Sequence, residues 1–369
     1  MVDTGADTGL AVVGLAGVVV TPILRHHSDL TGSEVWEGDA RQVAAQLEDD
    51  VASLAIFDGP YAMNKAEWDR LKVSDLAAWY RPYLEDASRL LGASASLYFW
   101  NTAEGWAAVH PLLLSMGWTF RGPIVWHKPN GAAIKNAHEE GARHWPDVTE
   151  VCALYQRTCP EASGPFLALA EKMESERQRL GLSRATIDES MKTSNVSQYW
   201  WQQREWRCPT EEHWIHLQNL SGGFQWSWHQ MKEWENQARS QYNASRPPFD
   251  CPLGVGNVWT HPTVAGPKRL RAEDGSTLHP CQKPLLFAER MIRASSRPGD
   301  TVWAPFGGTI REAVAAEQIA RSNPEEARRV ITAELNQDGR DYLGPSIRQL
   351  RGLGTRRVDP RQGQLFGGT

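Results

Sequence analysis

Positive charge of the kind that coats many nucleic-acid-binding proteins is missing from this chain, whose formal net charge is −5 at pH 7. That balance excludes a wholly basic surface, although a local basic groove remains compatible with it. Cysteine is also scarce: the five cysteines form no C-x-x-C pair, and we interpret them as reduced thiols of an intracellular protein. Some histidines lack the spacing of metal ligands, so we predict no metal; they are His110, His138, His144 and His261.

Long hydrophobic runs are missing too. The apolar stretch near the N-terminus, Leu10–Leu24, contains Thr21 and Pro22 and is shorter than the roughly 20 residues that a bilayer span needs. Asp3 and Asp7 precede it, where a signal peptide would carry positive charge. We therefore expect a β-hairpin or a packed arm here, and no membrane association.

Patterns typical of strands and of helices alternate in two parts of the chain. Strands are expected at 51–57, 96–100, 121–127, 151–156, 301–303 and 329–335. Helices are expected at 71–91, with Gly92 as C-cap, and at 109–116, 284–295 and 312–321. Such alternation predicts an α/β fold with a mostly parallel, twisted sheet and helices on both of its faces.

The segment between these parts, from about 161 to 250, is polar, rich in tryptophan and without strand alternation. We interpret it as a helical insert that separates a first half of the α/β domain, 1–160, from a second half, 251–343. The tail, 344–369, is rich in glycine, arginine and glutamine and is expected to be mobile.

Two groups of residues follow predicted strands and carry chemistry. Asp58-Gly59-Pro60-Tyr61 comes directly after the buried strand at 51–57, and ligands of open α/β sheets bind at the carboxyl ends of strands. Taken alone, this sequence is also typical of an ordinary turn. The second group contains a glycine-rich turn at 305–309, which lets a ligand approach the backbone, and Glu334 at a strand end, which can hold the ribose hydroxyls of an adenosine cofactor.

Together the motifs resemble the β-type DNA amino-methyltransferases of bacteria and phages, in which the catalytic motif precedes the cofactor motif. Members typically read G-D, D-P-P-Y, W-x-K-P, H-P-x-Q-K-P, D-P-F-x-G-S-G and an acidic strand end. The corresponding blocks occur here in the same order, at Gly38-Asp39, Asp58–Tyr61, Trp126–Pro129, His279–Pro284, Pro305–Gly308 and Glu334–Asn336. The resemblance implies a Rossmann-like methyltransferase fold and S-adenosylmethionine as cofactor.

The resemblance also implies roles for individual residues. The side chain of Asp58 and the carbonyl of Gly59 would accept the N–H groups of an exocyclic base amine, within a catalytic motif completed by Pro60 and Tyr61. Tyr61 would stack on the base, which must first be flipped out of the duplex. The cofactor pocket would be lined by Asp39, Asp58, Lys283, Pro305, Phe306, Gly307, Gly308, Thr309, Glu334 and Asn336.

Three positions depart from the family pattern. Gly59 replaces the first proline of D-P-P-Y, for which we expect a looser loop, and Ala304 replaces the aspartate of D-P-F. Ile310 replaces the second glycine of G-S-G, although a β-branched residue resists positive φ. Either the loop is re-shaped or cofactor binding is weakened, so a non-catalytic DNA-binding protein on a decayed methyltransferase fold is an alternative.

The insert resembles a phage-repressor helix-turn-helix between Met173 and Leu220, with a helix break before an N-cap at Ser183. A recognition helix is expected to start within 193–199. We predict that three residues bind DNA; they are Lys128 of the W-x-K-P block, Asn195 and Gln198. The alternative is an insert whose tryptophans only build its own core, a role that we expect for Trp200, Trp201 and Trp214.

The predicted function is methyl transfer to the N6 amine of adenine in double-stranded DNA, with the N4 amine of cytosine as the close alternative. The helix-turn-helix-like insert disfavours RNA or small molecules as substrates. In the tail, Gln362–Phe366 resembles the Q-x-x-L-F peptide that docks on the bacterial sliding clamp, although a tail without function fits equally. A homodimer is compatible with this prediction, and so is a location in the cytoplasm of a bacterial or phage-infected cell.

Overall fold

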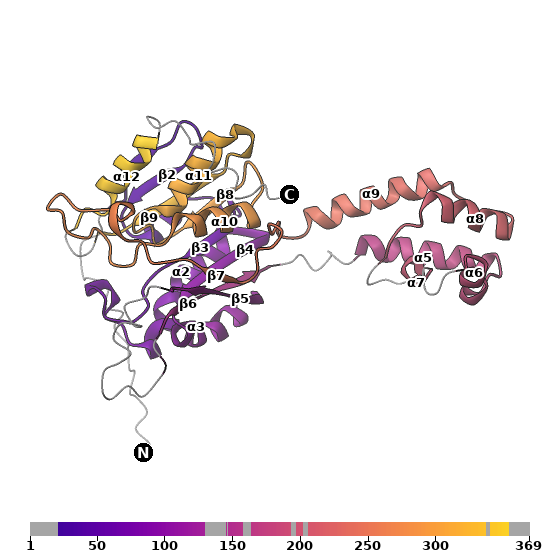
Figure 1. Cartoon of the computed structure of the whole chain (residues 1–369), viewed down its shortest axis with the longest axis horizontal. Coiled ribbons are helices and arrows are strands. Elements are labelled where there is room, and N and C mark those ends of the chain that lie inside the picture. The colour runs from indigo at the N-terminus through magenta and orange to yellow at the C-terminus, as the bar shows by residue number, and fades with distance from the viewer. Residues whose placement is uncertain are drawn as a thin grey trace, which may run out of the picture. The chain divides into compact units, whose positions relative to one another are not determined.

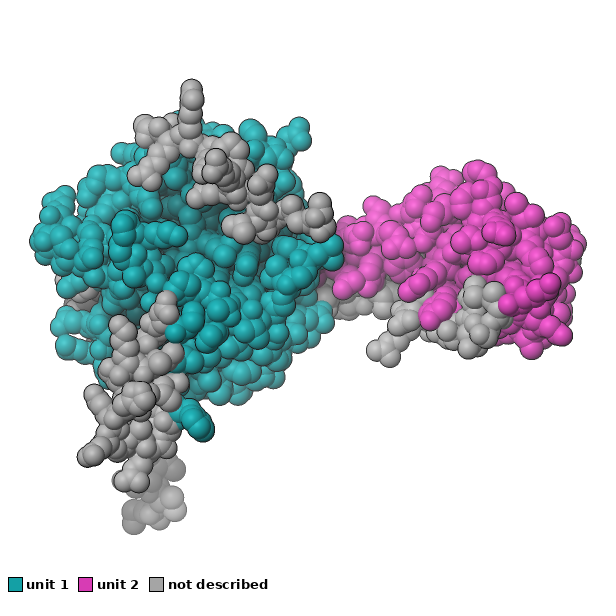
Figure 2. All heavy atoms as spheres, in the orientation of Figure 1, with its two compact units in different colours: residues 1–157, 248–369 teal, residues 158–247 magenta. Residues whose placement is uncertain are grey.

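The structure is a computed structural model that describes residues 21–129, 145, 147–157, 164–192, 197–201, 206–336 and 340–353. The chain forms two compact units, shown in different colours in Figure 2. Unit 1 consists of residues 1–157 and 248–369, and unit 2 of residues 158–247. Unit 2 covers nearly the same residues as the helical insert expected at 161–250.

Unit 1 is built on a nine-stranded sheet with the order β1-β2-β9-β8-β3-β4-β6-β5-β7. Its strands are β1 Ile23–His27, β2 Glu34–Glu37, β3 Ala52–Phe57, β4 Leu91–Asn101, β5 Thr119–His127, β6 Thr149–Gln156, β7 Val258–Thr260, β8 Thr301–Ala304 and β9 Arg329–Glu334. Neighbouring strands are parallel except in the pairs β1–β2, β4–β6 and β5–β6. The predicted mostly parallel α/β sheet is confirmed.

Helices cover both faces of the sheet, as Figure 1 shows for α10, α11 and α12 on one face and α2 and α3 on the other. The helices of unit 1 are α1 Ala40–Ala44, α2 Leu76–Leu90, α3 Ala103–Ser115, α10 Leu285–Ser295, α11 Arg311–Ser322 and α12 Leu343–Gly352, with short 3-10 turns at Glu67–Asp69, Val73–Asp75, Gly266–Lys268 and Pro324–Glu326. The burial of β3 on both faces explains why its sequence is continuously apolar. Leu54 and Ile56 lie in one hydrophobic core, and Ala55 and Phe57 lie in the other. A strand that is buried on both faces needs apolar residues at every position.

The order of the strands defines where a ligand can bind. Helix α2 connects β3 to β4 on one face, whereas α11 connects β8 to β9 on the other. Strands β3 and β8 are parallel neighbours, so the chain leaves them toward opposite faces. Such a switch point opens a crevice at the carboxyl ends of the strands, which is where ligands bind in doubly wound sheets.

Two expectations for unit 1 are wrong. The C-cap of α2 is Leu91, and Gly92 lies inside β4, because the chain enters the strand without a separate turn. The tail was expected to be mobile from residue 344, but residues up to Gly352 belong to helix α12. This helix buries Leu343, Ile347 and Leu350 at helical spacing in the core. The rest of the tail, including the segment 362–366, lies outside the described residues, as do residues 1–20.

Unit 2 is helical, with α5 Gly164–Arg179, α6 Arg184–Ser190, α7 Gln198–Trp201, α8 Glu211–Ser221 and α9 Trp228–Ala244. The side chain of Ser183 accepts the N–H of Thr186 at the start of α6, as expected for an N-cap. The expected core role of three tryptophans is confirmed, because the hydrophobic core of the unit contains Trp200, Trp201 and Trp214. Of the expected recognition helix, residues 193–196 lie outside the described residues, and the described part is α7.

No helix in the described part of the chain combines the length and the apolar character that crossing a membrane requires.

Candidate active site

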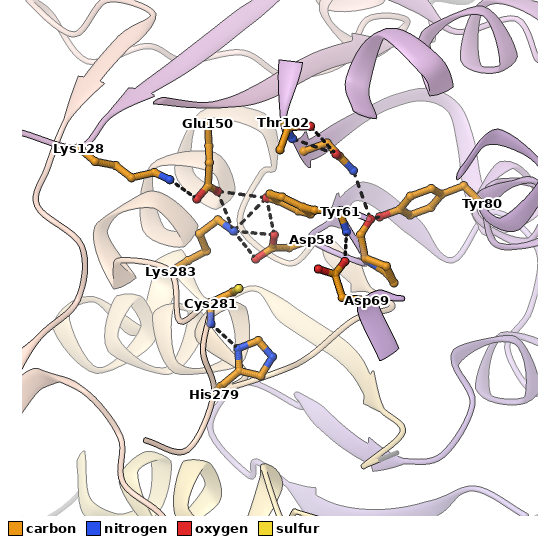
Figure 3. A network of polar contacts seen from close by, with 12 residues as sticks. Asp58, Tyr61, Asp69, Tyr80, Thr102, Lys128, Glu150, His279, Cys281 and Lys283 are labelled. Carbon is orange, nitrogen blue, oxygen red and sulfur yellow. Dashed lines mark hydrogen bonds and ion pairs between the residues drawn. The ribbon is translucent and has the colours of Figure 1, made fainter. Parts of the chain in front are cut away.

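The catalytic motif and the glycine-rich loop meet at the switch point of the sheet. Strand β3 ends at Phe57 and is followed by Asp58–Tyr61, and the neighbouring β8 ends at Ala304 and is followed by Pro305–Gly308. A third segment, His279–Pro284, leads into α10 and brings Lys283 against the catalytic motif (Figure 3). Three of the sequence blocks are therefore brought together at one edge.

Asp58 is held by two neighbours (Figure 3). The ammonium of Lys283 lies 2.7 Å from Oδ1 and 3.0 Å from Oδ2 of Asp58, and 3.0 Å from the hydroxyl of Tyr61. The Tyr61 hydroxyl donates to Oδ1 of Asp58 at 2.9 Å. Lys283, expected to line the cofactor pocket, thus contacts the catalytic carboxylate directly.

A second carboxylate, that of Glu150, completes this network, and sequence reasoning missed it. Its Oε2 lies 3.2 Å from the ammonium of Lys283 and 3.2 Å from the hydroxyl of Tyr61, while its Oε1 lies 2.6 Å from the ammonium of Lys128. Glu150 stands at the beginning of β6, a strand that runs antiparallel to β4. Because β6 is reversed, its first residues lie at the same edge as the carboxyl ends of the parallel strands.

Burial and charge tune these groups in opposite directions. Burial raises the pKa of Asp58 above its usual value, and the charge of Lys283 offsets part of that rise. Burial alone would also raise the pKa of Glu150, but Lys283 and Lys128 bring it below its usual value. The pKa of Lys283 is raised by Asp58 and Glu150, which outweigh the effect of its burial. The network therefore balances two carboxylates with two ammonium groups.

The loop that carries Tyr61 is organised by Asp69, another residue missed in the sequence. The buried carboxylate of Asp69 accepts four backbone N–H groups of this loop, at 2.7 to 3.1 Å. They belong to Tyr61, Ala62, Met63 and Lys65. Two non-glycine residues of the loop have positive φ, Ala62 at 61° and Asn64 at 55°. A carboxylate that accepts several N–H groups fixes such a conformation.

Gly59 does not loosen the catalytic motif. A Cβ atom at this position would lie 2.7 Å from the hydroxyl of Tyr80 and 2.9 Å from the ring of Phe306. The same Tyr80 hydroxyl donates to the carbonyl of Pro60 at 2.9 Å. The expectation of a looser loop is wrong, because the absence of a side chain at Gly59 is what permits this close packing.

On the other side of the crevice, the loop after β8 is bonded to the end of β9. The N–H of Gly307 donates to the carbonyl of Ala333 at 2.7 Å, and the N–H of Gly308 to the carboxylate of Glu334 at 2.5 Å. The N–H of Gly38 donates to the carbonyl of Glu334, and Asp39 then caps α1 by accepting the N–H of Arg41.

Phe306 packs against four aromatic rings, those of Phe57, Trp79, Tyr80 and Tyr83. Thr309 is buried next to this loop. The amide of Asn336 donates to Glu37 and accepts the N–H of Tyr342, so it is engaged in holding the loop after β9. Of the residues expected to bind the cofactor, Asp39, Phe306–Gly308 and Glu334 therefore lie at the edge of the sheet where the parallel strands end.

Ile310, which stands where the family pattern has a glycine, has a left-handed backbone. Its φ of 47° and ψ of 41° are left-handed, and its side chain is fully buried. Its N–H donates to the carbonyl of Gly307 at 2.6 Å. The β-branched residue therefore adopts the positive φ that it resists, and the burial of its side chain offsets the strain of this conformation.

Of the three residues expected to bind DNA, the structure describes the side chain of Lys128. Lys128 is paired with Glu150 and also lies over the ring of Trp126, 4.9 Å from its centroid. Asn195 and the side chain of Gln198 lie outside the described residues. Within the described residues, no group of histidine, cysteine or acidic side chains is arranged to hold a metal ion.

Comparison with known proteins adds to this geometry. A family model described as DNA methylase, for the N6 and N4 methyltransferases, matches residues 52–344. Type II methyltransferase M1.MboII of Moraxella bovis is 23% identical over 286 residues, which cover 75% of this chain and 84% of that protein. DNA adenine methyltransferase YhdJ of Escherichia coli K12 is 32% identical over 120 residues, which cover 32% of this chain and 36% of that protein.

Two solved structures are similar in the path of the chain. The cytosine-N4-specific PvuII DNA methyltransferase aligns with a TM-score of 0.49 at 12% identity, covering 91% of each chain. The complex of M1.HpyAVI with S-adenosylmethionine aligns with a TM-score of 0.43 at 15% identity, covering 85% of this chain and 98% of the other.

Proposed function

Because the chain belongs to the N6/N4 family of DNA methylases, and so is an S-adenosylmethionine-dependent DNA methyltransferase, we propose that it methylates the N6 amine of adenine. The observation that carries this proposal is the Asp58 carboxylate at the switch point, followed by the Gly59 carbonyl and by Tyr61. Asp58 is the first residue of the catalytic motif, and aspartate there favours adenine. The match to a DNA adenine methyltransferase over a third of the chain supports the same base.

The residues of the crevice fit the cofactor. Glu334 ends β9 beside the glycine-rich loop and can hold the ribose hydroxyls. Gly307 lets the loop pack closely against Thr332 and Ala333 of β9, while a Cβ at Gly308 would meet only His279, at 3.6 Å. Phe306 offers an aromatic ring between the loop and the catalytic motif. When bound, S-adenosylmethionine supplies an electrophilic methyl group on a sulfonium sulfur.

Asp58 and Gly59 act on the base. An exocyclic amine is a poor nucleophile, because its lone pair is conjugated with the ring. When its N–H groups donate to the Asp58 carboxylate and the Gly59 carbonyl, the nitrogen gains electron density toward the methyl group. A bond forms between nitrogen and the methyl carbon as the carbon–sulfur bond breaks, and the nitrogen then loses a proton, for which Asp58 is the nearest acceptor. Burial raises the pKa of Asp58, which makes it a better acceptor.

Substrate recognition in this proposal is shared between the units. Tyr61 stacks on the flipped base, unit 2 recognises the target sequence through Asn195 and Gln198, and Lys128 binds the DNA. We further propose double-stranded DNA as the substrate and a cytoplasmic location. The homodimer remains a prediction. So does the clamp contact of Gln362–Phe366, which binding of a tail peptide to purified sliding clamp, with and without Phe366→Ala, would test.

The first experiment is methylation of unmethylated DNA of mixed sequence with labelled S-adenosylmethionine, followed by mass spectrometry of the nucleosides. N6-methyladenine that is absent with Asp58→Ala would establish the base and the catalytic residue together. N4-methylcytosine would keep the mechanism and correct the base. No methylated nucleoside, with DNA binding intact, would instead support the non-catalytic alternative.

A further inference from the structure

Glu312 is a buried carboxylate at the same edge that the catalytic network does not use. It lies in the first turn of α11, the helix that starts directly after the glycine-rich loop, and is only 8% exposed. Because β8 and β3 are neighbours, this turn stands beside the catalytic motif. The charge of Asp58 raises the pKa of Glu312 and the charge of Lys283 lowers it, so Glu312 lies within electrostatic range of the catalytic network.

Among the described residues, no side chain is hydrogen-bonded to or ion-paired with Glu312, and its carboxylate accepts its own backbone N–H. Its neighbour Arg311 turns the other way: the guanidinium donates to the Thr309 carbonyl at 3.1 Å and to Gln349 of α12 at 2.5 Å. Lys283 is committed to Asp58 and Glu150. A buried carboxylate without a cation is unfavourable, and burial with the nearby charge of Asp58 raises the pKa of Glu312 to about 7.

The chemistry of the cofactor supplies the missing cation. S-adenosylmethionine carries a ribose diol, which suits Glu334, a sulfonium, which must face the base amine, and a methionine end with an ammonium and a carboxylate. Only the ammonium combines positive charge with N–H donors. A charge-assisted hydrogen bond from it would satisfy a carboxylate that has no cationic partner among the described residues.

We propose that Glu312 binds the α-ammonium group of the methionine part of S-adenosylmethionine and thereby fixes that end of the cofactor. This inference rests on the proposed methyltransferase function and adds a residue that the sequence motifs did not indicate.

The test is a binding cycle on the full chain by isothermal titration calorimetry, and it needs no turnover. The ligands are S-adenosylhomocysteine and its deaminated analogue, which keeps the carboxylate and lacks only the amine. The variants are Glu312→Gln and the control Glu317→Gln. Glu317 is also a buried acid on α11, but it is paired with Ser28 and Arg321.

We expect Glu312→Gln to weaken S-adenosylhomocysteine by about 10- to 100-fold, as for a charge-assisted bond, and to leave the deaminated analogue within twofold. Glu317→Gln should change neither. Equal affinities of the wild type and Glu312→Gln for S-adenosylhomocysteine would overturn the inference. An equal loss for both ligands would also overturn it, because Glu312 would then only shape the loop.

Two outcomes separate this inference from the proposed function. If the wild type binds neither ligand, the methyltransferase proposal fails together with the inference. If S-adenosylhomocysteine binds unchanged to Glu312→Gln while N6-methyladenine formation is lost, Glu312 acts on the base, and only the inference fails.

Discussion

The raised pKa of Glu312 predicts how the stability of the protein without ligand depends on pH. The pKa changes from 4.5 for an ordinary glutamate to about 7 in the folded chain, so between these values the folded state binds the proton more tightly than the unfolded state. Stability contributed by this residue is therefore present below pH 4.5 and is lost as the pH rises toward 7. Glu312→Gln, which carries no charge, removes this dependence.

The size of the effect follows from the shift. A difference of one pKa unit corresponds to about 1.4 kcal/mol, so the wild type should lose roughly 3 kcal/mol relative to Glu312→Gln between pH 4.5 and pH 8. Urea unfolding at pH 5 and pH 8, with both proteins side by side, measures this difference. Groups such as Asp58, Lys283 and Arg311, which act on Glu312, remain in both proteins, so their own titrations largely cancel.

At pH 5 the two proteins should unfold at nearly the same urea concentration, and at pH 8 the variant should be the more stable one. A constant difference across this range would refute the reasoning, because Glu312 would then be charged, or neutral, at every pH tested. Saturating S-adenosylhomocysteine should reverse the order at pH 8, since the ligand pairs only with the wild-type carboxylate. Glu312 would then lower the stability of the free protein and raise that of the complex. This is expected where a buried charge serves ligand binding and not folding.

Three more predictions concern the residues around the crevice. At position 310, whose backbone is left-handed, Ile310→Gly should be about 1 kcal/mol more stable in urea unfolding than Ile310→Ala, the reverse of the usual helical order; equal stability would contradict the strain. Asp69→Asn, which cannot accept all four loop N–H groups, should lower kcat about tenfold or more while calorimetry finds unchanged S-adenosylhomocysteine affinity; a kcat close to that of the wild type would refute the positioning role. Glu150→Gln should lower kcat about 10- to 100-fold and shift its pH profile, because Lys283 then opposes the positive charge developing on the amine; an unshifted profile would argue for a purely structural role.

The sequence was sufficient for those parts of the site that follow the ends of parallel strands. Asp58 comes directly after β3 and Glu334 ends β9, and parallel strands bring their carboxyl ends to one edge whatever the loops do. Their positions at the ends of parallel strands therefore predicted that they lie at the same edge of the sheet. Burial of β3 on both faces was equally visible in its unbroken apolar run.

What the sequence did not reveal depends on register and on reversed strands. Glu150 reaches the site because β6 is antiparallel to β4, with Asn101 opposite Val151. A single acidic residue at the start of a strand does not indicate that reversal. Asp69 acts through the backbone of its own loop, a contact that leaves no pattern in residue types. The helix α12 was mistaken for a mobile tail because its glycine and arginine content outweighed three apolar residues at helical spacing.

The departures from the family pattern at Ala304 and Ile310 raised the alternative of a non-catalytic protein on a decayed fold. The geometry of the crevice argues against that alternative. A loop that no longer had to approach a ligand would gain stability by relaxing a left-handed residue, yet Ile310 is left-handed and its side chain is buried. Burying two carboxylates with two ammonium groups is seldom stabilising compared with apolar residues of the same size. Glu312, which has no ion-pair partner in the described part of the chain, increases that cost on the same edge. The carboxylate of Glu312 becomes favourable once a cationic cofactor occupies the crevice, and it would oppose the binding of a DNA backbone, which carries negative charge.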